Sequence, residues 1–128
     1  MTEDELNSLI DAWIAFHLEP EMAPEKKENW WAVLKVTEWM LSGGDNPELL
    51  WQFITAAYKR PLPDIAVASL AAGPLEDLLA HYGADYIDRI ETLAQQDPKF
   101  NHLLGGVWKN AMTPDIWRRI EAARIKAW

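Results

Sequence analysis

The best arrangement of metal-ligating residues in the sequence is Asp77, His81 and Asp85, which are spaced four residues apart. On one continuous helix these side chains would share a face, and carboxylate and imidazole groups are common metal ligands. Gly83 is expected to end the helix before Asp85, which would separate the three groups. We therefore predict no metal site, and we interpret Glu76 and Asp77 as first-turn carboxylates that interact favourably with the helix dipole.

The other residues that could support catalysis have less informative surroundings. His17 lies on an apolar helical stripe, where a part-buried histidine with a hydrogen-bond partner is expected, and His102 is expected at the surface. None of the serines stands in a nucleophile-elbow sequence, and the two Gly-Gly pairs lack the flanking residues of a phosphate-binding loop. The absence of cysteine excludes disulfides, thiolate zinc sites and cysteine nucleophiles. We expect a protein that is not an enzyme, with no catalytic residue and no cofactor.

The segments that must position these residues have the 3.6-residue periodicity of α-helices, and none alternates as a strand would. The sequence predicts one all-α domain over residues 1–128, a compact array of about eight helices joined by short turns. The short helix pairs of the C-terminal half resemble HEAT or armadillo packing, although no repeat period holds over three units. The predicted helices cover residues 3–18, 24–42, 47–60, 64–72, 74–82, 85–96, 98–108 and 114 onward.

Glycines and tryptophans supply further expectations about packing. The apolar stripe of the helix at 98–108 runs through Gly105 and Gly106, so both are predicted inside that helix, facing a closely packed neighbour. Adjacent Trp30 and Trp31 must point about 100° apart, so one of them is expected to be exposed and available to a partner. Trp128 is expected to pack back on the domain. Four of the eight tryptophans are predicted in the core: Trp13, Trp51, Trp108 and Trp117.

The charge is large and unevenly distributed. The net charge is −8, with 18 acidic and 6 basic residues at positions 1–97 but 2 acidic and 6 basic residues at positions 98–128. Such an acidic chain is not expected to bind nucleic acid through its phosphates. The first five residues are polar and acidic, unlike a signal peptide, and the longest apolar run, residues 65–72, is too short to span a membrane. We expect a cytoplasmic protein that does not bind membranes.

Several sequence elements occur together and point to a family. The most specific are Gly-Pro-Leu-Glu-Asp-Leu-Leu at 73–79 and Leu-Leu-Gly-Gly-Val-Trp at 103–108, accompanied by Ala-Trp-Ile-Ala-Phe-His at 12–17. With these elements the chain resembles an uncharacterised bacterial family of small helical proteins, a domain of unknown function, over almost its whole length. The resemblance implies a bacterial cytoplasmic protein but no known activity, substrate or site. Many small acidic families of this kind are immunity proteins for toxins.

These observations favour an acidic interaction protein that binds and neutralises a basic protein partner, most simply an immunity protein for a bacterial nuclease-type toxin. The alternative is a structural or regulatory adaptor that uses a hydrophobic helical groove, with the acidic charge serving solubility. The predicted partner-binding surface crowds like charges on two successive helices, with Arg89 as the only basic residue nearby. Its residues are Glu76, Asp77, Asp85, Asp88 and Glu91.

Overall fold

The regular structure of the chain is helical. The computed structural model describes residues 1–20, 24–40 and 46–128, and none of these residues belongs to a strand. The predicted all-α fold is therefore confirmed. The chain divides into two compact units, residues 1–66 and 67–128, with the boundary inside a helix. No helix in the described ranges combines the length and the apolar character needed to span a bilayer.

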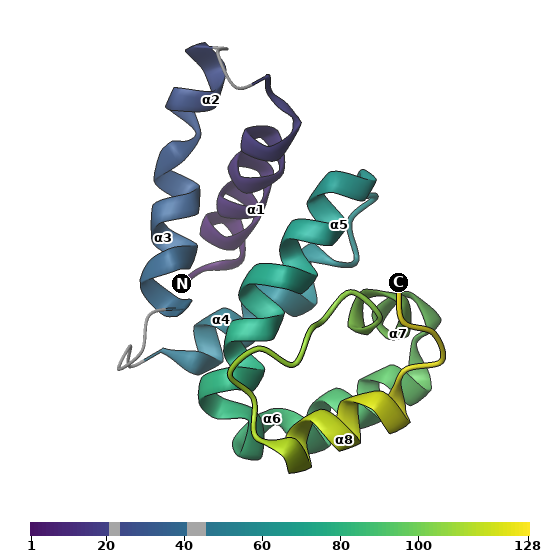
Figure 1. The fold of residues 1–128 in the computed structure, drawn as a ribbon. Helices are drawn as coiled ribbons and strands as arrows, with labels where there is room; N and C mark the ends of the chain where they lie inside the picture. Colours follow the sequence, from purple (N-terminus) through teal and green to yellow (C-terminus); the bar gives the residue numbers. More distant parts are fainter. Residues whose placement is uncertain (21–23, 41–45) are drawn as a thin grey trace. The chain divides into compact units, whose positions relative to one another are not determined.

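The N-terminal unit is built from helices that pack on one another in pairs (Figure 1). Helix α1 packs on α3 and on α4, and α3 packs on α4. The buried apolar side chains of these helices form the centre of the unit; among them are Leu9, Ile10, Trp13, Ala32, Val36, Trp39, Leu50, Phe53 and Ile54. The helices are α1 (Glu3–Leu18), α2 (Pro24–Glu28), α3 (Trp30–Met40), α4 (Pro47–Ala57) and the first part of α5 (Asp64–Leu70).

The first helix has the predicted bounds because its start is encoded locally. Thr2 and Glu5 form a capping box, in which the Thr2 hydroxyl accepts the Glu5 N–H and the Glu5 carboxylate accepts the Thr2 N–H. The helix predicted over 24–42 is interrupted at Asn29, which separates α2 from α3, and its predicted end at residue 42 lies outside the described residues. Asn46 precedes α4 as predicted, but its side chain makes no capping hydrogen bond.

The C-terminal unit differs from its prediction because two expected helix breaks are absent. The π-helical segment η1 (Ala71–Leu75) continues without interruption from α5 into α6 (Glu76–Gln96), so the predicted break at Gly73-Pro74 is wrong. A wider π turn relieves the clash that a proline ring makes with the carbonyl four residues earlier in an α-helix. The predicted end at Gly83 is also wrong, since α6 only kinks there, at Tyr82 (φ −132°, ψ 22°).

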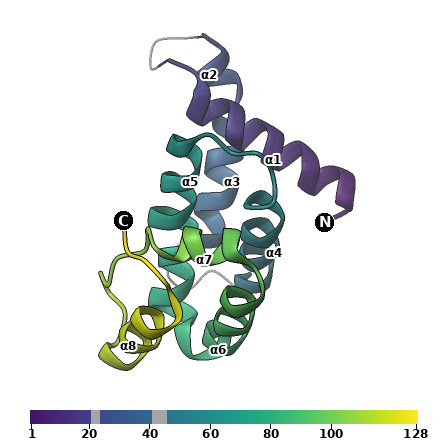
Figure 2. The same ribbon diagram turned by 90° about the vertical axis from the view of Figure 1, so that its right-hand side faces the viewer.

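One long kinked helix therefore replaces the expected succession of short helix pairs. Helices α7 (Pro98–Leu104) and α8 (Pro114–Ala123) both pack against α6 (Figure 1 and Figure 2). At the kink, Gly83 is buried, and a Cβ atom added there would lie 3.1 Å from Cγ2 of Ile116 on α8. The glycine that the sequence suggested as a helix end thus serves as a contact between two helices.

Gly105 and Gly106 lie in a turn after α7, so the prediction of a continuous helix to Trp108 is wrong. The predicted close approach at these glycines is present, but the neighbour is the non-helical segment after α8. A Cβ atom on Gly105 would lie 2.3 Å from the carbonyl oxygen of Lys126, and one on Gly106 would lie 2.6 Å from the ring of Trp128. Trp108, predicted in the core, is 70 % exposed because the helix ends before it.

Candidate functional site

The five residues predicted to bind a partner all lie on α6, but they do not form one free acidic surface. Glu76 is buried, with 5 % of its surface exposed, whereas Asp85 and Asp88 are exposed. Asp77 and Glu91 are half-buried. Burial raises the pKa of the Asp77 carboxyl, an effect opposed by the neighbouring His81. Glu76 and Asp77 are therefore less available to a partner than their sequence positions suggest.

A basic residue from another helix engages two of these carboxylates. Arg119 on α8 donates from Nη2 to Oδ1 of Asp88 at 2.6 Å and from Nε to Oε2 of Glu91 at 2.9 Å, and its Nη2 also contacts Oε1 of Glu91. The hydrogen bonds that the guanidinium donates to Glu91 and Asp88 raise its pKa. The premise that Arg89 is the only basic residue near this cluster is therefore wrong. Arg119 lies 28 positions after Glu91, so no local spacing could have indicated the contact.

The suggested metal ligands Asp77, His81 and Asp85 stay on one helix, but the kink at Tyr82 lies between His81 and Asp85. Within the described parts of the chain, no three histidine, aspartate or glutamate side chains are grouped so that they could hold a metal ion.

His17, as expected, is half-buried and bonded, with Nδ1 2.8 Å from the carbonyl oxygen of Trp13. Burial is the main cause that lowers the pKa of His17.

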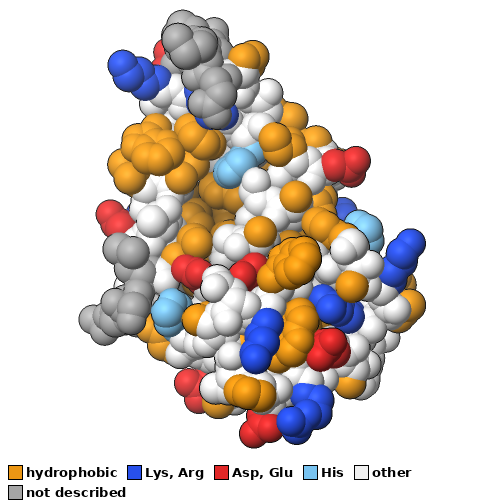
Figure 3. All heavy atoms as spheres, in the orientation of Figure 1, with side chains coloured by type: hydrophobic (Ala, Val, Ile, Leu, Met, Phe, Trp, Pro, Cys, Tyr) orange, Lys and Arg blue, Asp and Glu red, His pale blue; other side chains and the backbone are white. Residues whose placement is uncertain are grey.

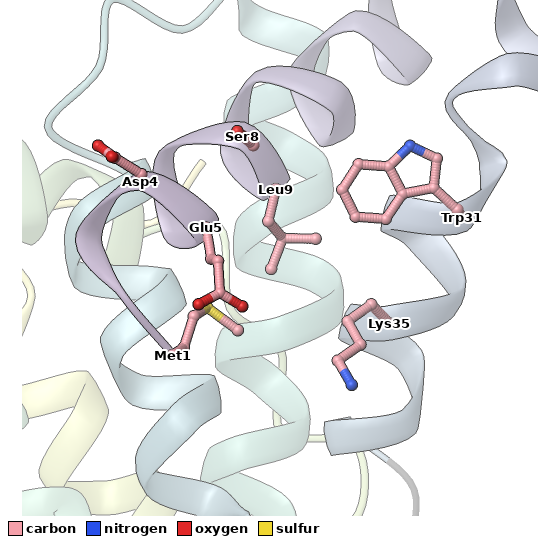
Figure 4. A pocket seen from close by; sticks show the side chains of 7 residues that line it. All are labelled: Met1, Asp4, Glu5, Ser8, Leu9, Trp31 and Lys35. Carbon is pink, nitrogen blue, oxygen red and sulfur yellow. The ribbon is translucent and has the colours of Figure 1, made fainter.

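The N-terminal unit contains a surface groove between α1 and α3, with a volume of about 360 Å³. Leu9 extends from α1 toward α3, and the indole ring of Trp31 extends from α3 toward Leu9 (Figure 4). Trp31 is 50 % exposed, and Leu34, one helical turn further along α3, is 47 % exposed. We call this feature the α1–α3 groove; it is lined by Met1, Asp4, Glu5, Ser8, Leu9, Trp31 and Lys35.

The α1 side of the groove is acidic. Helix α1 contains four carboxylates and no lysine or arginine. Glu5 is fixed by the capping box, whereas Glu3 and Asp4 are exposed and enter no ion pair with any residue that the structure describes. Asp11, by contrast, is bonded to Arg60 at 2.6 Å. The free carboxylates therefore gather at the first turn of α1, beside the groove.

Aromatic contacts fix α1 against α3 at the far end of this pair of helices. Phe16 on α1 and Trp30 on α3 have ring centroids 5.4 Å apart, and Lys26 Nζ lies 4.5 Å from the centroid of Phe16. His17 lies between the rings of Trp13 and Phe16, with centroid distances of 4.1 and 5.3 Å. Figure 3 shows hydrophobic side chains gathered over the upper end of α3 and the adjoining part of α1. These contacts hold the two walls of the groove in place.

The exposed tryptophans were only partly predictable. Both Trp30 and Trp31 are exposed, at 45 % and 50 %, where the sequence predicted one. Their adjacency on a helix was the available signal, since two neighbouring rings cannot share one buried face. The groove itself had no such signal, because Leu9 and Trp31 are brought together by the packing of α1 on α3.

Comparison with known proteins gives a family and nothing more specific. A family model described as a family of unknown function (DUF6869) matches residues 19–128. The match begins after α1, so it includes the α3 wall of the groove but not the α1 wall. Neither the search of curated proteins nor that of solved structures found a match to the chain.

Proposed function

We propose that this chain, which belongs to the family of unknown function DUF6869, is an acidic interaction protein that binds and neutralises a basic protein. A nuclease-type toxin in the cytoplasm of a bacterium is the partner that best fits this chemistry. The observation that carries the proposal is the juxtaposition, in the α1–α3 groove, of the Asp4 carboxylate on α1, unpaired among the described residues, with the exposed indole ring of Trp31 on α3. The role is binding rather than catalysis.

The distribution of charge supports the N-terminal unit as the binding region. Residues 1–66 contain 12 acidic and 5 basic residues, whereas residues 67–128 contain 8 acidic and 7 basic residues. A concentrated negative charge accelerates encounters with a basic partner and disfavours acidic ones. Nuclease domains bind phosphates through lysine and arginine, so an acidic protein can compete for the same side chains.

Asp85 on α6 is a second candidate contact. It is exposed, and none of the ion pairs in the described ranges involves it, unlike those that bind Asp88 and Glu91 to Arg119. The predicted α6 surface is thereby reduced to Asp85 and the exposed part of Asp88. We give the α1–α3 groove precedence because it adds apolar area to the charge, and partly buried aromatic residues contribute most of the free energy of binding in protein interfaces.

An adaptor that binds through apolar contacts alone is the alternative function, and the exposed Trp31 and Leu34 favour it. The two functions differ in their dependence on salt. Charge-steered association slows as ionic strength rises, because the Debye length falls to about 8 Å at physiological salt and about 3 Å at 1 M. Apolar association is not weakened in this way. The association rate constant at low and high salt therefore distinguishes them.

The direct test is to capture the partner from the organism that encodes the chain and to assay what it does. We expect a basic protein whose nuclease activity is suppressed by one equivalent of this chain. Three single charge reversals compare the candidate surfaces: Asp4→Lys on α1, Asp85→Lys on α6, and the matched control Glu121→Lys on the exposed surface of α8. Asp4→Lys should slow association most, and Glu121→Lys least. A captured partner that is acidic, or one that keeps full activity when bound, would contradict the proposal.

A further inference from the structure

We infer that the α1–α3 groove accepts a basic amphipathic α-helix of its partner, a step that rests on the proposed function and specifies the partner's binding element. The groove runs between two packed helices, and its walls differ in character. On the α3 wall the apolar side chain is Trp31, and Lys35 follows it in the lining, while Leu34 is exposed beside the groove. The α1 wall presents Asp4 and Glu5. A helix whose apolar stripe is bordered by lysine or arginine on the side that faces α1 matches both walls at once.

The spacing of the apolar side chains fits a helical partner. Trp31 lines the groove, and Leu34, three residues later, is exposed beside it on the same side of α3, one turn away. Leu9 supplies the floor between the helices, and it is 2 % exposed. A third helix packed along such a ridge would place its own apolar residues at intervals of three and four positions against it. An extended segment would present alternate residues and match this spacing poorly.

Charge complementarity specifies the flanks of the partner helix. Glu3 and Asp4 have no ion-pair partner among the described residues, so a lysine or arginine beside the apolar stripe would gain a contact without breaking an existing one. On the opposite wall, Lys35 lies 3.7 Å from Glu38, which leaves its charge partly compensated. The partner helix should therefore be basic on the side that faces α1 and need not be basic on the side that faces α3.

The test uses synthetic peptides, so it does not depend on finding the natural partner. The probe is a leucine-lysine peptide with leucines at helical spacing. One control has the same composition with leucine and lysine alternating, and a second has glutamate in place of lysine. Amide chemical shifts of the intact chain report where each peptide binds. We expect only the helical lysine peptide to bind, with shifts concentrated on α1 and α3.

Two matched substitutions test the walls. Trp31→Ala should weaken binding of the probe by about tenfold or more, as expected for an aromatic anchor, whereas Trp108→Ala, at a still more exposed tryptophan of the other unit, should leave it unchanged. Asp4→Lys should weaken the lysine peptide and improve the glutamate peptide. Circular dichroism and the unfolding midpoint of each variant establish that it is folded. Should Trp31→Ala fail to fold, Leu34→Ser repeats the test at the exposed apolar residue one turn further along α3, beside the groove.

Several results would overturn the inference. Equal binding of the alternating peptide, or shifts that map to α6 or α8, would show that charge alone drives binding. A dimer in sedimentation velocity that Trp31→Ala dissociates would show that a second copy of the chain occupies the groove. The inference can fail in this way while a basic partner is still captured through Asp85. Conversely, the peptide can bind the groove as expected while capture yields no basic partner, in which case the proposed function alone fails.

Discussion

The acidic clusters on α6, in the C-terminal unit, and on the first turn of α1, in the N-terminal unit, differ in how far their carboxylates are paired within the fold. In the C-terminal unit, Asp88 and Glu91 are bonded to Arg119, and Asp115 is bonded to Arg118. In the N-terminal unit, Glu3 and Asp4 have no such partner among the described residues, although Asp11 is bonded to Arg60. An acidic surface is therefore a candidate for binding only where its charges are not already compensated by ion pairs within the fold.

The same distinction, between a group that is used within the fold and one that is not, applies to one tryptophan from each unit. Trp31 and Trp128 are almost equally exposed, at 50 % and 49 %. Trp128, however, donates its indole N–H to the carbonyl of His102 at 2.8 Å and covers Gly106, so it is part of the packing of its unit. For Trp31 the structure gives no such bond to any described residue, and it borders the α1–α3 groove. Partial exposure therefore has different meanings in the two units.

The largest expected effect separates buried from exposed tryptophans within the N-terminal unit. Trp39 is 3 % exposed, so Trp39→Ala should lower the free energy of unfolding by about 3–5 kcal/mol. Trp31→Ala should change it by less than about 1 kcal/mol, because half of its surface is already in water. Denaturant unfolding of the two variants at pH 7 measures both. Equal losses of unfolding free energy would mean that Trp31 is a structural residue. The contrast between Trp31 and the packed Trp128 would then no longer hold.

The next prediction tests how tightly residues 124–128 pack on the turn that follows α7 in the C-terminal unit. Gly105→Ala should lower the free energy of unfolding by about 1–3 kcal/mol, because the new methyl group would overlap the backbone oxygen of Lys126, which cannot rotate away. Gly83→Ala is the matched control. Its methyl group would meet only the side chain of Ile116 at 3.1 Å, and alanine is the better helix former, so the change should be near zero. A neutral Gly105→Ala would indicate that residues 124–128 detach from the turn readily.

The elements that the sequence predicted well are those with local signals. The capping box at Thr2 and Glu5 defines the start of α1, and Thr113, followed by Pro114, caps α8, which begins at the predicted residue. In both cases the hydrogen bonds that cap the start of the helix join residues within three positions of one another. Such signals do not depend on the rest of the fold, and neither does the 3.6-residue periodicity from which the all-α class was predicted.

The failures have a common cause in contacts between distant residues. Gly73-Pro74 and Gly83 are usual helix terminators, yet tertiary packing keeps the chain helical through both. Arg119 approaches Asp88 across 31 positions, which removed much of the predicted acidic surface. The α1–α3 groove likewise depends on how two helices pack. Composition predicted an acidic protein, and the adjacency of Trp30 and Trp31 predicted an exposed tryptophan. The position of the unpaired carboxylates relative to that tryptophan could be found only from the structure.

A smaller effect tests whether Arg119 compensates the α6 carboxylates. Arg119→Met keeps most of the apolar side chain but removes the charge that Asp88 and Glu91 share. We expect a modest loss of stability that shrinks as salt is added, since the contact is partly exposed and the repulsion left behind is screened. Arg118→Met, whose pairing with Asp115 is more exposed, should have less effect. If Arg119→Met also strengthened binding of the basic leucine-lysine peptide at α6, the carboxylates of α6 would again be a candidate binding surface.

The smallest expected effect concerns pH and is confined to the N-terminal unit. His17 is half-buried among Trp13 and Phe16, and burial lowers its pKa below the ordinary value of 6.5, with nearby Lys26 acting in the same direction. A base with a lower pKa in the folded state favours folding when neutral. Its contribution is therefore fully present above pH 6.5 and is lost as the pH falls below that value toward the folded-state pKa.

Unfolding of the wild type and of His17→Gln should be compared between pH 7.5 and 5.5, with His102→Gln as the control because His102 is exposed. The wild type and His102→Gln should lose stability over this range, and His17→Gln should lose less. Identical slopes in all three proteins would mean that His17 remains hydrated in the folded state and that the aromatic contacts at this end of α1 and α3 open readily in solution.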